Sequence, residues 1–224
     1  MKNAVNVMVV AGGWSVSKIP EKVRNNLINE ACVIGVNDSA IHMPVDYALT
    51  MDRLWLEHRI DKMRELGITT YYRRCTAKNV QPEYPQFVPY FGDIWRGQMT
   101  LEPGHLWGNN SGRVALNLAY QLAPKRVFML GFDFKLGPNG EKHWYPPYSW
   151  GGGAKVSKMA EWSTEFEYAA HQFEMAQCDL YVVATKGTSI IAPERVPRIS
   201  IENFVKGEWR DPPRHDRSRN KVNP

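Results

Sequence analysis

Polar residues in the middle of the chain have the types and spacing of an anion-binding helix start. Residues 110–113 supply amides, a hydroxyl and an unhindered backbone just before residues 114–122, whose apolar side chains recur at helical spacing. Ser111 is the N-cap that this pattern predicts, and free backbone N–H groups at such a helix start attract phosphate. The residues predicted to contact a nucleotide here are Asn110, Ser111, Gly112 and Arg113.

A carboxylate follows the next apolar run. Residues 127–130 are continuously apolar, as a strand covered on both faces requires, and Asp133 lies shortly beyond them. The pattern therefore predicts Asp133 at the carboxyl end of a buried strand, where open α/β sheets bind ligands. The competing interpretation is an ordinary loop aspartate that follows a capped helix and a strand.

Three earlier predicted strands, at residues 4–11, 32–36 and 47–50, also end in polar or glycine residues. Glycine lets a backbone approach a ligand closely, although the GxGxxG dinucleotide pattern is absent. Asparagine and aspartate are also common turn residues, which is the alternative interpretation. Because parallel strands end at one edge of a sheet, we expect these groups to line one nucleotide site. The predicted contacts are Gly12, Gly13, Trp14, Ser15, Asn37, Asp38 and Asp52.

His143 is the candidate general acid or base. It lies in a polar, glycine-flanked segment beyond Asp133, and Trp144 and Tyr145 beside it can exclude water. Imidazole has an ordinary pKa of about 6.5, so it can accept a proton at neutral pH. A surface-loop histidine without a partner is the competing interpretation, and His105 and His171 are the other candidates. The predicted catalytic residues are His143, Tyr145 and Asp133.

The elements that must position these residues alternate between apolar strands and amphipathic helices. This alternation predicts an α/β fold with a doubly wound, mainly parallel sheet of about six strands and helices on both faces. We expect one domain over residues 1–205, with an aromatic-rich insert at about 76–107 and a lid segment at about 135–153. Further strands are predicted at residues 68–72, 127–134 and 178–184, and helices at 20–30, 53–66, 114–122 and 154–177.

Composition limits the class of protein. A hydrophobic content of 43% in 224 residues supports a folded core. No apolar run reaches the roughly 20 residues that span a bilayer, and the N-terminus lacks a signal-peptide pattern. Three widely spaced cysteines without a CxxC motif are typical of buried thiols in a reducing cytoplasm, so we expect a cytoplasmic protein.

The chain carries a net charge of +5, and a basic tail is predicted over residues 206–224. Residues 206–221 hold six Lys or Arg against three Asp or Glu. The simpler interpretation is a solvated, flexible extension. The alternative is weak contact with nucleic acid, although no nucleic-acid-binding motif supports it.

The stretch 108–134 holds a recognisable set of residues, namely Ser111, Gly112, Ala119, Lys125 or Arg126, Val127, Phe128, Leu130, Gly131, Asp133 and Phe134. This set resembles a signature shared by small bacterial CMP-sialic-acid sialyltransferases and the related pterin-pyrophosphokinase-like proteins. The sequence departs from that pattern in two places. Pro124 stands where the family usually has glycine, and Ala160 stands where the sialyltransferases carry a catalytic histidine.

The resemblance implies a Rossmann-like fold and a glycosyltransferase whose donor is a nucleotide-activated sugar. It also implies that Asn37 places its amide against the nucleotide. Tyrosines of a mobile lid, here Tyr145 and Tyr148, would reach the donor phosphate. The expected partners are thus a small-molecule nucleotide donor and an acceptor of unknown identity, with no metal site.

Two alternatives remain open from the sequence. One is a pyrophosphokinase-like enzyme that transfers diphosphate from ATP to an alcohol, with Mg²⁺ held by carboxylates such as Asp52 and Asp133. The other is a non-catalytic nucleotide-binding protein on the same fold, an option that the missing family histidine keeps open.

Overall fold

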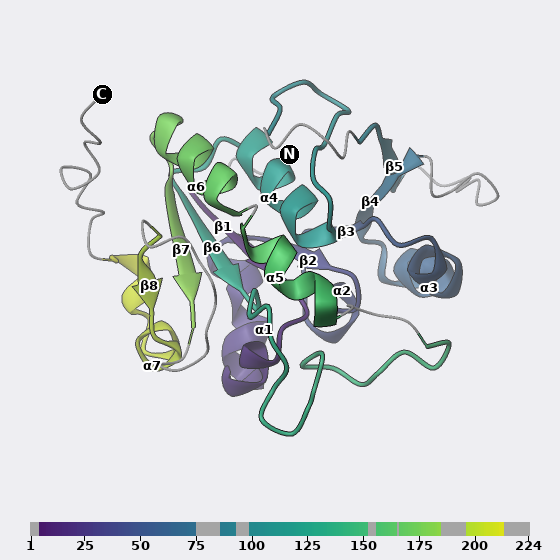
Figure 1. Ribbon diagram of the computed structural model, residues 1–224, viewed down its shortest axis with the longest axis horizontal. Helices are drawn as coiled ribbons and strands as arrows, with labels where there is room; N and C mark the ends of the chain where they lie inside the picture. Colours follow the sequence, from purple (N-terminus) through teal and green to yellow (C-terminus); the bar gives the residue numbers. More distant parts are fainter. Residues whose placement is uncertain are drawn as a thin grey trace.

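The computed structural model describes residues 5–74, 86–92, 99–151, 156–164, 166–184 and 196–212. Within them, parallel strands form one sheet in the order β5-β4-β3-β2-β1-β6-β7-β8 (Figure 1). This confirms the predicted doubly wound α/β fold, with eight strands in place of about six. The strands are β1 (Asn6–Val10), β2 (Cys32–Val36), β3 (Tyr47–Thr50), β4 (Thr69–Arg73), β5 (Phe87–Tyr90), β6 (Arg126–Leu130), β7 (Asp179–Val183) and β8 (Arg198–Ile199).

The order of the strands reverses at β1. The strand β1 pairs with β2 on one side and with β6 on the other. Strands β2 to β5 then follow outward on the first side, and strands β6 to β8 follow outward on the second. The connections that follow β1 and β6 consequently lead to helices on opposite faces of the sheet. In open α/β sheets, such a switch point is where ligands bind.

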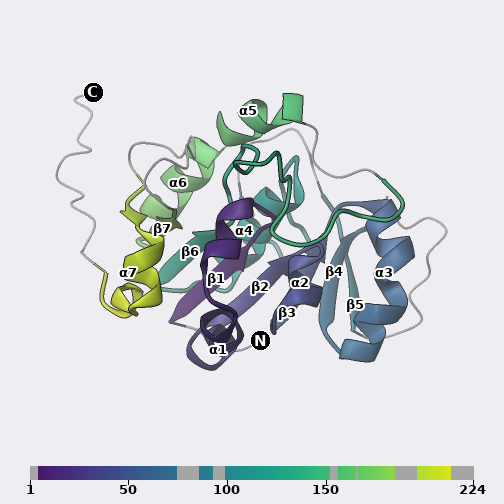
Figure 2. The same cartoon turned by 90° about the horizontal axis from the view of Figure 1, so that it is seen from below.

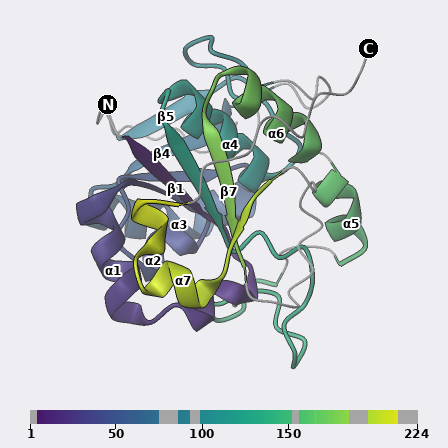
Figure 3. The same ribbon diagram turned by 90° about the vertical axis from the view of Figure 1, so that its left-hand side faces the viewer.

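Helices cover both faces of the sheet, and the alternation of side chains along each strand explains why both can be apolar. Val7 and Val9 of β1 pack with α4 (Ser111–Gln121) and α6 (Phe166–Met175). Met8 and Val10 belong to the core of the other face, which Figures 2 and 3 show covered by four further helices of different lengths. Those helices are α1 (Glu21–Glu30), α2 (Ser39–His42), α3 (Arg53–Leu66) and α7 (Ile201–Val205).

Several elements match their predictions because their signals are local. The strands β2 and β3 have the expected bounds, and α3 ends at Gly67 as predicted. Gly67 has a φ of 66°, which glycine adopts without a Cβ penalty.

Other predicted bounds are corrected. The N-cap of α4 is Asn110 and not Ser111, because the Asn110 side chain accepts a hydrogen bond from the Arg113 backbone N–H at 3.0 Å. The predicted helix 154–177 is two helices, α5 (Val156–Thr164) and α6, with residue 165 outside the described residues.

The predicted irregular insert contains the edge strand β5. Pro89 lacks a backbone donor, but β5 lies at the edge of the described sheet and pairs there with β4, so no second ladder of described strands loses a bond. Tyr90 and Leu106 are buried in the core beside α4. Residues 75–85 and 93–98 of the insert lie outside the described residues.

The chain after β7 returns to the core. Residues 185–195 lie outside the described residues, and β8, α7 and the short helix η3 (Glu208–Arg210) follow. Trp209 is 2% exposed, and its ring centroid lies 5.6 Å from that of Phe128 and 5.8 Å from that of Phe204. The predicted boundary at 205 thus falls inside a packed segment. Residues 213–224 lie outside the described residues.

Within the described part of the chain, none of the helices has the length and apolar character needed to cross a bilayer.

Candidate functional site

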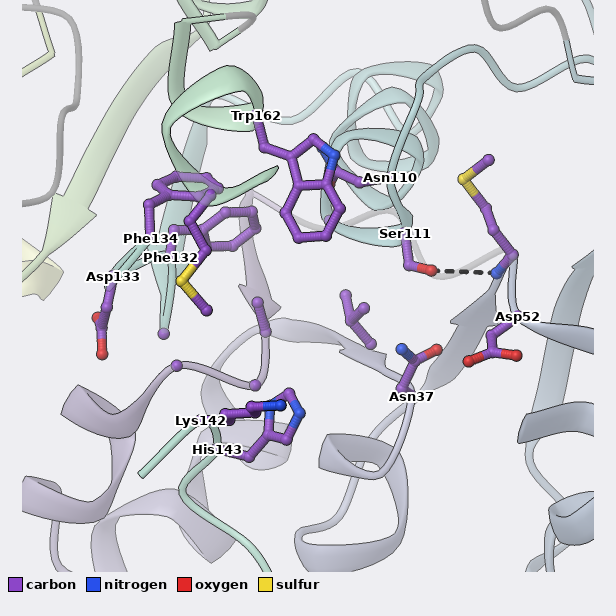
Figure 4. A pocket seen from close by; sticks show the side chains of 18 of the residues that line it. Asn37, Asp52, Asn110, Ser111, Phe132, Asp133, Phe134, Lys142, His143 and Trp162 are labelled. Carbon is purple, nitrogen blue, oxygen red and sulfur yellow. Dashed lines mark hydrogen bonds between the residues drawn. The ribbon is translucent and has the colours of Figure 1, made fainter. Parts of the chain in front are cut away.

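A cavity of about 410 Å³ opens at the carboxyl edge of the sheet, at the β1/β6 switch point (Figure 4). Loops after β1, β2, β3 and β6 form it together with the start of α4, the lid segment and α5. Its lining residues are Ala11, Gly12, Gly13, Val36, Asn37, Met51, Asp52, Asn109, Asn110, Ser111, Gly112, Gly131, Phe132, Asp133, Phe134, Lys135, Lys142, His143, Tyr145, Tyr148, Met159 and Trp162.

The loops after β1 and β6 touch each other through backbone. A Cβ atom on Gly13 would lie 2.3 Å from the Gly131 carbonyl oxygen, so only glycine permits this approach. The Asp133 carboxylate then fastens the two loops, because it accepts hydrogen bonds from the Ser15 backbone N–H at 2.6 Å and from the Ser15 hydroxyl at 2.5 Å. Burial raises the pKa of Asp133, and the Ser15 hydrogen bonds oppose this shift.

We expect stability to fall with rising pH because of Asp133. An unfolded aspartate has a pKa of about 3.9, and the folded pKa is higher, so the folded state binds this proton more tightly. The contribution is complete below the unfolded pKa and is lost as pH rises through the folded pKa. Asp133→Asn removes this pH-dependent contribution, so in urea unfolding the stability of the variant relative to the wild type should rise as the pH increases from about 3.9 through the folded pKa of Asp133. A difference that does not change with pH would refute this expectation.

The first turn of α4 faces the cavity. The Ser111 hydroxyl accepts a hydrogen bond from the Met51 backbone N–H at 3.1 Å, drawn as a dashed line in Figure 4. This bond ties the end of β3 to the start of α4. The helix start carries the partial positive charge of aligned peptide dipoles, which suits an anionic ligand group.

Two polar side chains on the cavity wall have buried atoms without a hydrogen-bond partner among the described residues. They are Asn37, through Oδ1, and His143, whose ring nitrogens make no hydrogen bond of good geometry although the Gly12 backbone lies close enough to raise the His143 pKa. Asn37 has a φ of 53°, a left-handed conformation that asparagine tolerates better than most residues. Unpaired buried polar atoms are costly, so these two side chains mark where a ligand would supply partners.

His143 belongs to a cluster of aromatic rings with Tyr145, to which its ring is nearly parallel, and Tyr148, which is tilted against both. Its ring centroid lies 4.9 Å from that of Tyr145, and the Tyr145 and Tyr148 hydroxyls are 3.3 Å apart. Burial lowers the pKa of His143, which keeps the imidazole neutral and able to accept a proton near pH 7. Burial also raises the pKa of Tyr145 well above its ordinary value and that of Tyr148 to about 12, so both remain neutral donors.

Not every predicted site residue reaches the cavity. Asp38 is 1% exposed, accepts hydrogen bonds from Arg59 and Trp55, and does not line the cavity. Arg113 is 2% exposed and does not line the cavity. Trp14 and Ser15 also lie outside the lining.

The other predicted residues meet there. Asp52 lines the cavity and also caps α3, because its carboxylate accepts the Leu54 backbone N–H at 2.9 Å. The alternative bases, His105 and His171, are not among the lining residues. The predicted residues that do line the cavity are Gly12, Gly13, Asn37, Asp52, Asn110, Ser111, Gly112, Asp133, His143 and Tyr145.

Sequence reasoning missed the apolar wall of the cavity. Trp162 of α5 lies across the cavity from His143 in Figure 4, with Phe132 and Phe134 beside it. An aromatic residue on an amphipathic helix gives no signal that separates a cavity wall from the core. Among the described residues, no group of three or more His, Cys, Asp or Glu is arranged to hold a metal ion.

No protein-family profile and no curated protein matches the sequence. Among solved structures, the fold is similar to that of the MAf glycosyltransferase from Magnetospirillum magneticum AMB-1, with a TM-score of 0.59 and 13% sequence identity. The similarity covers 91% of this chain and 36% of that chain, so this chain spans little more than a third of that protein. At this identity the similarity concerns the fold, and it agrees with the Rossmann-like architecture.

Proposed function

We propose that this chain is a glycosyltransferase that uses a nucleotide-activated sugar as its donor. The observation that carries the proposal is that one cavity joins a helix start suited to phosphate with the unpartnered His143 and Asn37. The fold similarity to a glycosyltransferase of known structure supports the same class.

The proposed reaction forms a bond between an acceptor oxygen and the anomeric carbon. The bond from that carbon to the phosphate oxygen breaks, and the nucleotide leaves with the electron pair. His143 takes the proton of the acceptor hydroxyl, which its lowered pKa permits at neutral pH. The start of α4 and the neutral hydroxyls of Tyr145 and Tyr148 stabilise the charge that develops on the leaving phosphate.

The diphosphate-transfer alternative has less support in the arrangement of carboxylates. Figure 4 shows Asp133 and Asp52 at opposite ends of the view of the cavity, and each already accepts backbone hydrogen bonds. The two carboxylates are therefore not arranged as a shared Mg²⁺ clamp.

Thermal-shift measurements with CMP, UDP, GDP, ATP and their sugars, each with and without Mg²⁺, test the proposal. Stabilisation by one nucleotide and its sugar conjugate, followed by donor turnover, would support a glycosyltransferase. A response confined to ATP with Mg²⁺ would favour diphosphate transfer. Tight nucleotide binding without turnover of any donor would leave a binding protein.

We expect Asn37→Gly to weaken nucleotide binding roughly two- to tenfold, which is the usual net contribution of one hydrogen bond. Glycine adopts the φ of 53° without strain, so the variant removes the amide and preserves the backbone. Calorimetry measures the change, with Asn25→Ala on the exposed surface of α1 as the matched control. If Asn37→Gly binds the nucleotide as tightly as the wild type and the Asn25→Ala control do, Asn37 does not contact the nucleotide.

A further inference from the structure

In the described lid segment, residues 135–151, some side chains line the cavity and others contact neighbouring helices. Trp144 and Trp150 do not line the cavity. The Trp144 indole lies 4.8 Å from the Arg24 guanidinium of α1, and its N–H donates to the Ser39 hydroxyl of α2 at 3.2 Å. The lid side chains that line the cavity are Lys135, Lys142, His143, Tyr145 and Tyr148.

Trp150 connects the lid to α3. Its ring stacks on His58, with centroids 4.3 Å apart, and lies 4.8 Å from the Arg59 guanidinium. The same ring stacks on Tyr148, with centroids 4.7 Å apart and planes within 7°. A movement of Trp150 would therefore move a side chain of the cavity wall.

Asp38 fixes the guanidinium beneath this stack. Its carboxylate accepts hydrogen bonds from Arg59 Nε at 3.0 Å and Nη2 at 2.8 Å, and from the Trp55 indole N–H at 2.7 Å. A two-point bond to a buried carboxylate sets the plane of an arginine as well as its position. Asp38 also follows Asn37 directly, so the contact begins at the loop that lines the cavity after β2.

The contacts continue from Tyr148 to the candidate base. The Tyr148 and Tyr145 hydroxyls are 3.3 Å apart, and the Tyr145 ring lies parallel to that of His143 within 12°. His42 of α2 stacks on Tyr145 as well, with centroids 5.5 Å apart. The orientation of His143 is thus coupled to side chains that never touch the cavity.

We propose that Asp38 and Arg59 are positioning residues for the reaction. Through Trp150 they hold the cavity side of the lid, including His143, in its working geometry. The kinetic part of this inference rests on the glycosyl transfer proposed above, whereas the geometric part can be measured without any substrate.

Loosening the lid has a defined effect on His143. Burial is the main cause of its lowered pKa, Lys142 lowers it further, and the Gly12 carbonyl and Asp38 oppose the shift. Water that enters beside a loosened lid would reverse the effect of burial. The pKa of His143 should then rise toward the ordinary value of about 6.5.

Trp150→Ala is the main test. It removes the contact between Arg59 and the lid, and it leaves Arg59 in place as the partner of the buried Asp38 carboxylate. We expect kcat to fall roughly ten- to a hundredfold, since small misplacements of catalytic groups have effects of this size. The KM for the donor should change far less. In substrate-free protein, the NMR titration of His143 should move to higher pH, with its signal assigned by its loss in His143→Gln.

Two further variants complete the test. Tyr168→Ala removes an aromatic side chain that is 63% exposed on α6, and it should leave kcat and the His143 titration unchanged. Arg59→Lys keeps a cation beside Asp38 but lacks the planar fork, so it should reproduce the Trp150→Ala effects even if that variant folds poorly.

The outcomes separate this inference from the proposed function. If His143 titrates as in the wild type in both Trp150→Ala and Arg59→Lys, the positioning role is overturned, whatever the kinetics. If the titration moves but the wild-type protein turns over no donor, the positioning of His143 stands and the glycosyltransferase proposal fails.

Discussion

His143→Gln is expected to lower kcat by roughly 10²–10⁴, the usual effect of losing a general base. The imidazole is shielded, unpartnered among the described residues and held neutral by its lowered pKa, so it can take the acceptor proton at pH 7. Glutamine preserves polarity and approximate size but cannot accept a proton. Steady-state kinetics with the donor found in the thermal-shift screen measure the change, and calorimetry should show nearly unchanged nucleotide affinity.

The pH dependence of kcat/KM provides a second readout for the same variant. The wild-type rate should fall on the acidic side as His143 becomes protonated, at a pH below the ordinary imidazole value of about 6.5. That acidic limb should vanish in His143→Gln. His171→Gln, on the exposed surface of α6, is the control and should retain the limb. A His143→Gln enzyme within a few-fold of wild type, with its limb intact, would exclude His143 as the base.

Removal of the segment that contains Trp209 is expected to cause the largest loss of stability. Trp209 is 2% exposed and packs on Phe128 of β6 and Phe204 of α7. Truncating a buried tryptophan to alanine typically costs about 3–5 kcal/mol through lost burial and a residual cavity. We therefore expect Trp209→Ala, or a chain that ends at Lys206, to unfold at much lower urea concentration.

The matched control is a chain that ends at Pro212. It deletes most of the basic tail and keeps the contacts that Trp209 makes with other described residues, so its unfolding midpoint and its small-molecule turnover should equal those of the full chain. Equal stability of the chains that end at 206 and at 212 would show that Trp209 adds nothing to the core. A loss of turnover only in the chain that ends at 212 would give the basic residues a functional role.

The elements with local signals were predictable. Residues 32–36 and 47–50 are short apolar runs bounded by turn residues, and residues 53–66 end at a glycine with a φ of 66°. Such patterns depend on neighbours within a few residues, so they can be recognised without knowledge of the tertiary contacts. The edge strands β5 and β8 were not predicted, because one contains Pro89 and the other has two residues.

The general location of the site was also predictable. Strand ends that carry Gly12, Asn37 and Asp133 must meet if the strands are parallel, and all three line the cavity. The sequence alone thus determined a parallel α/β sheet with polar groups gathered at its carboxyl edge.

Only the tertiary structure decided which of these groups face the cavity. Asp38 and Asn37 are neighbours in the chain, yet Asn37 lines the cavity while Asp38 turns to Arg59, 21 residues away. Asp133 binds Ser15, which is 118 residues away, and Trp162 closes the wall opposite His143. The physical reason is that a polar side chain forms hydrogen bonds with whichever groups lie next to it after the chain has packed. Packing brings together segments that are far apart in the sequence, and nothing in their sequence spacing indicates that they will be in contact.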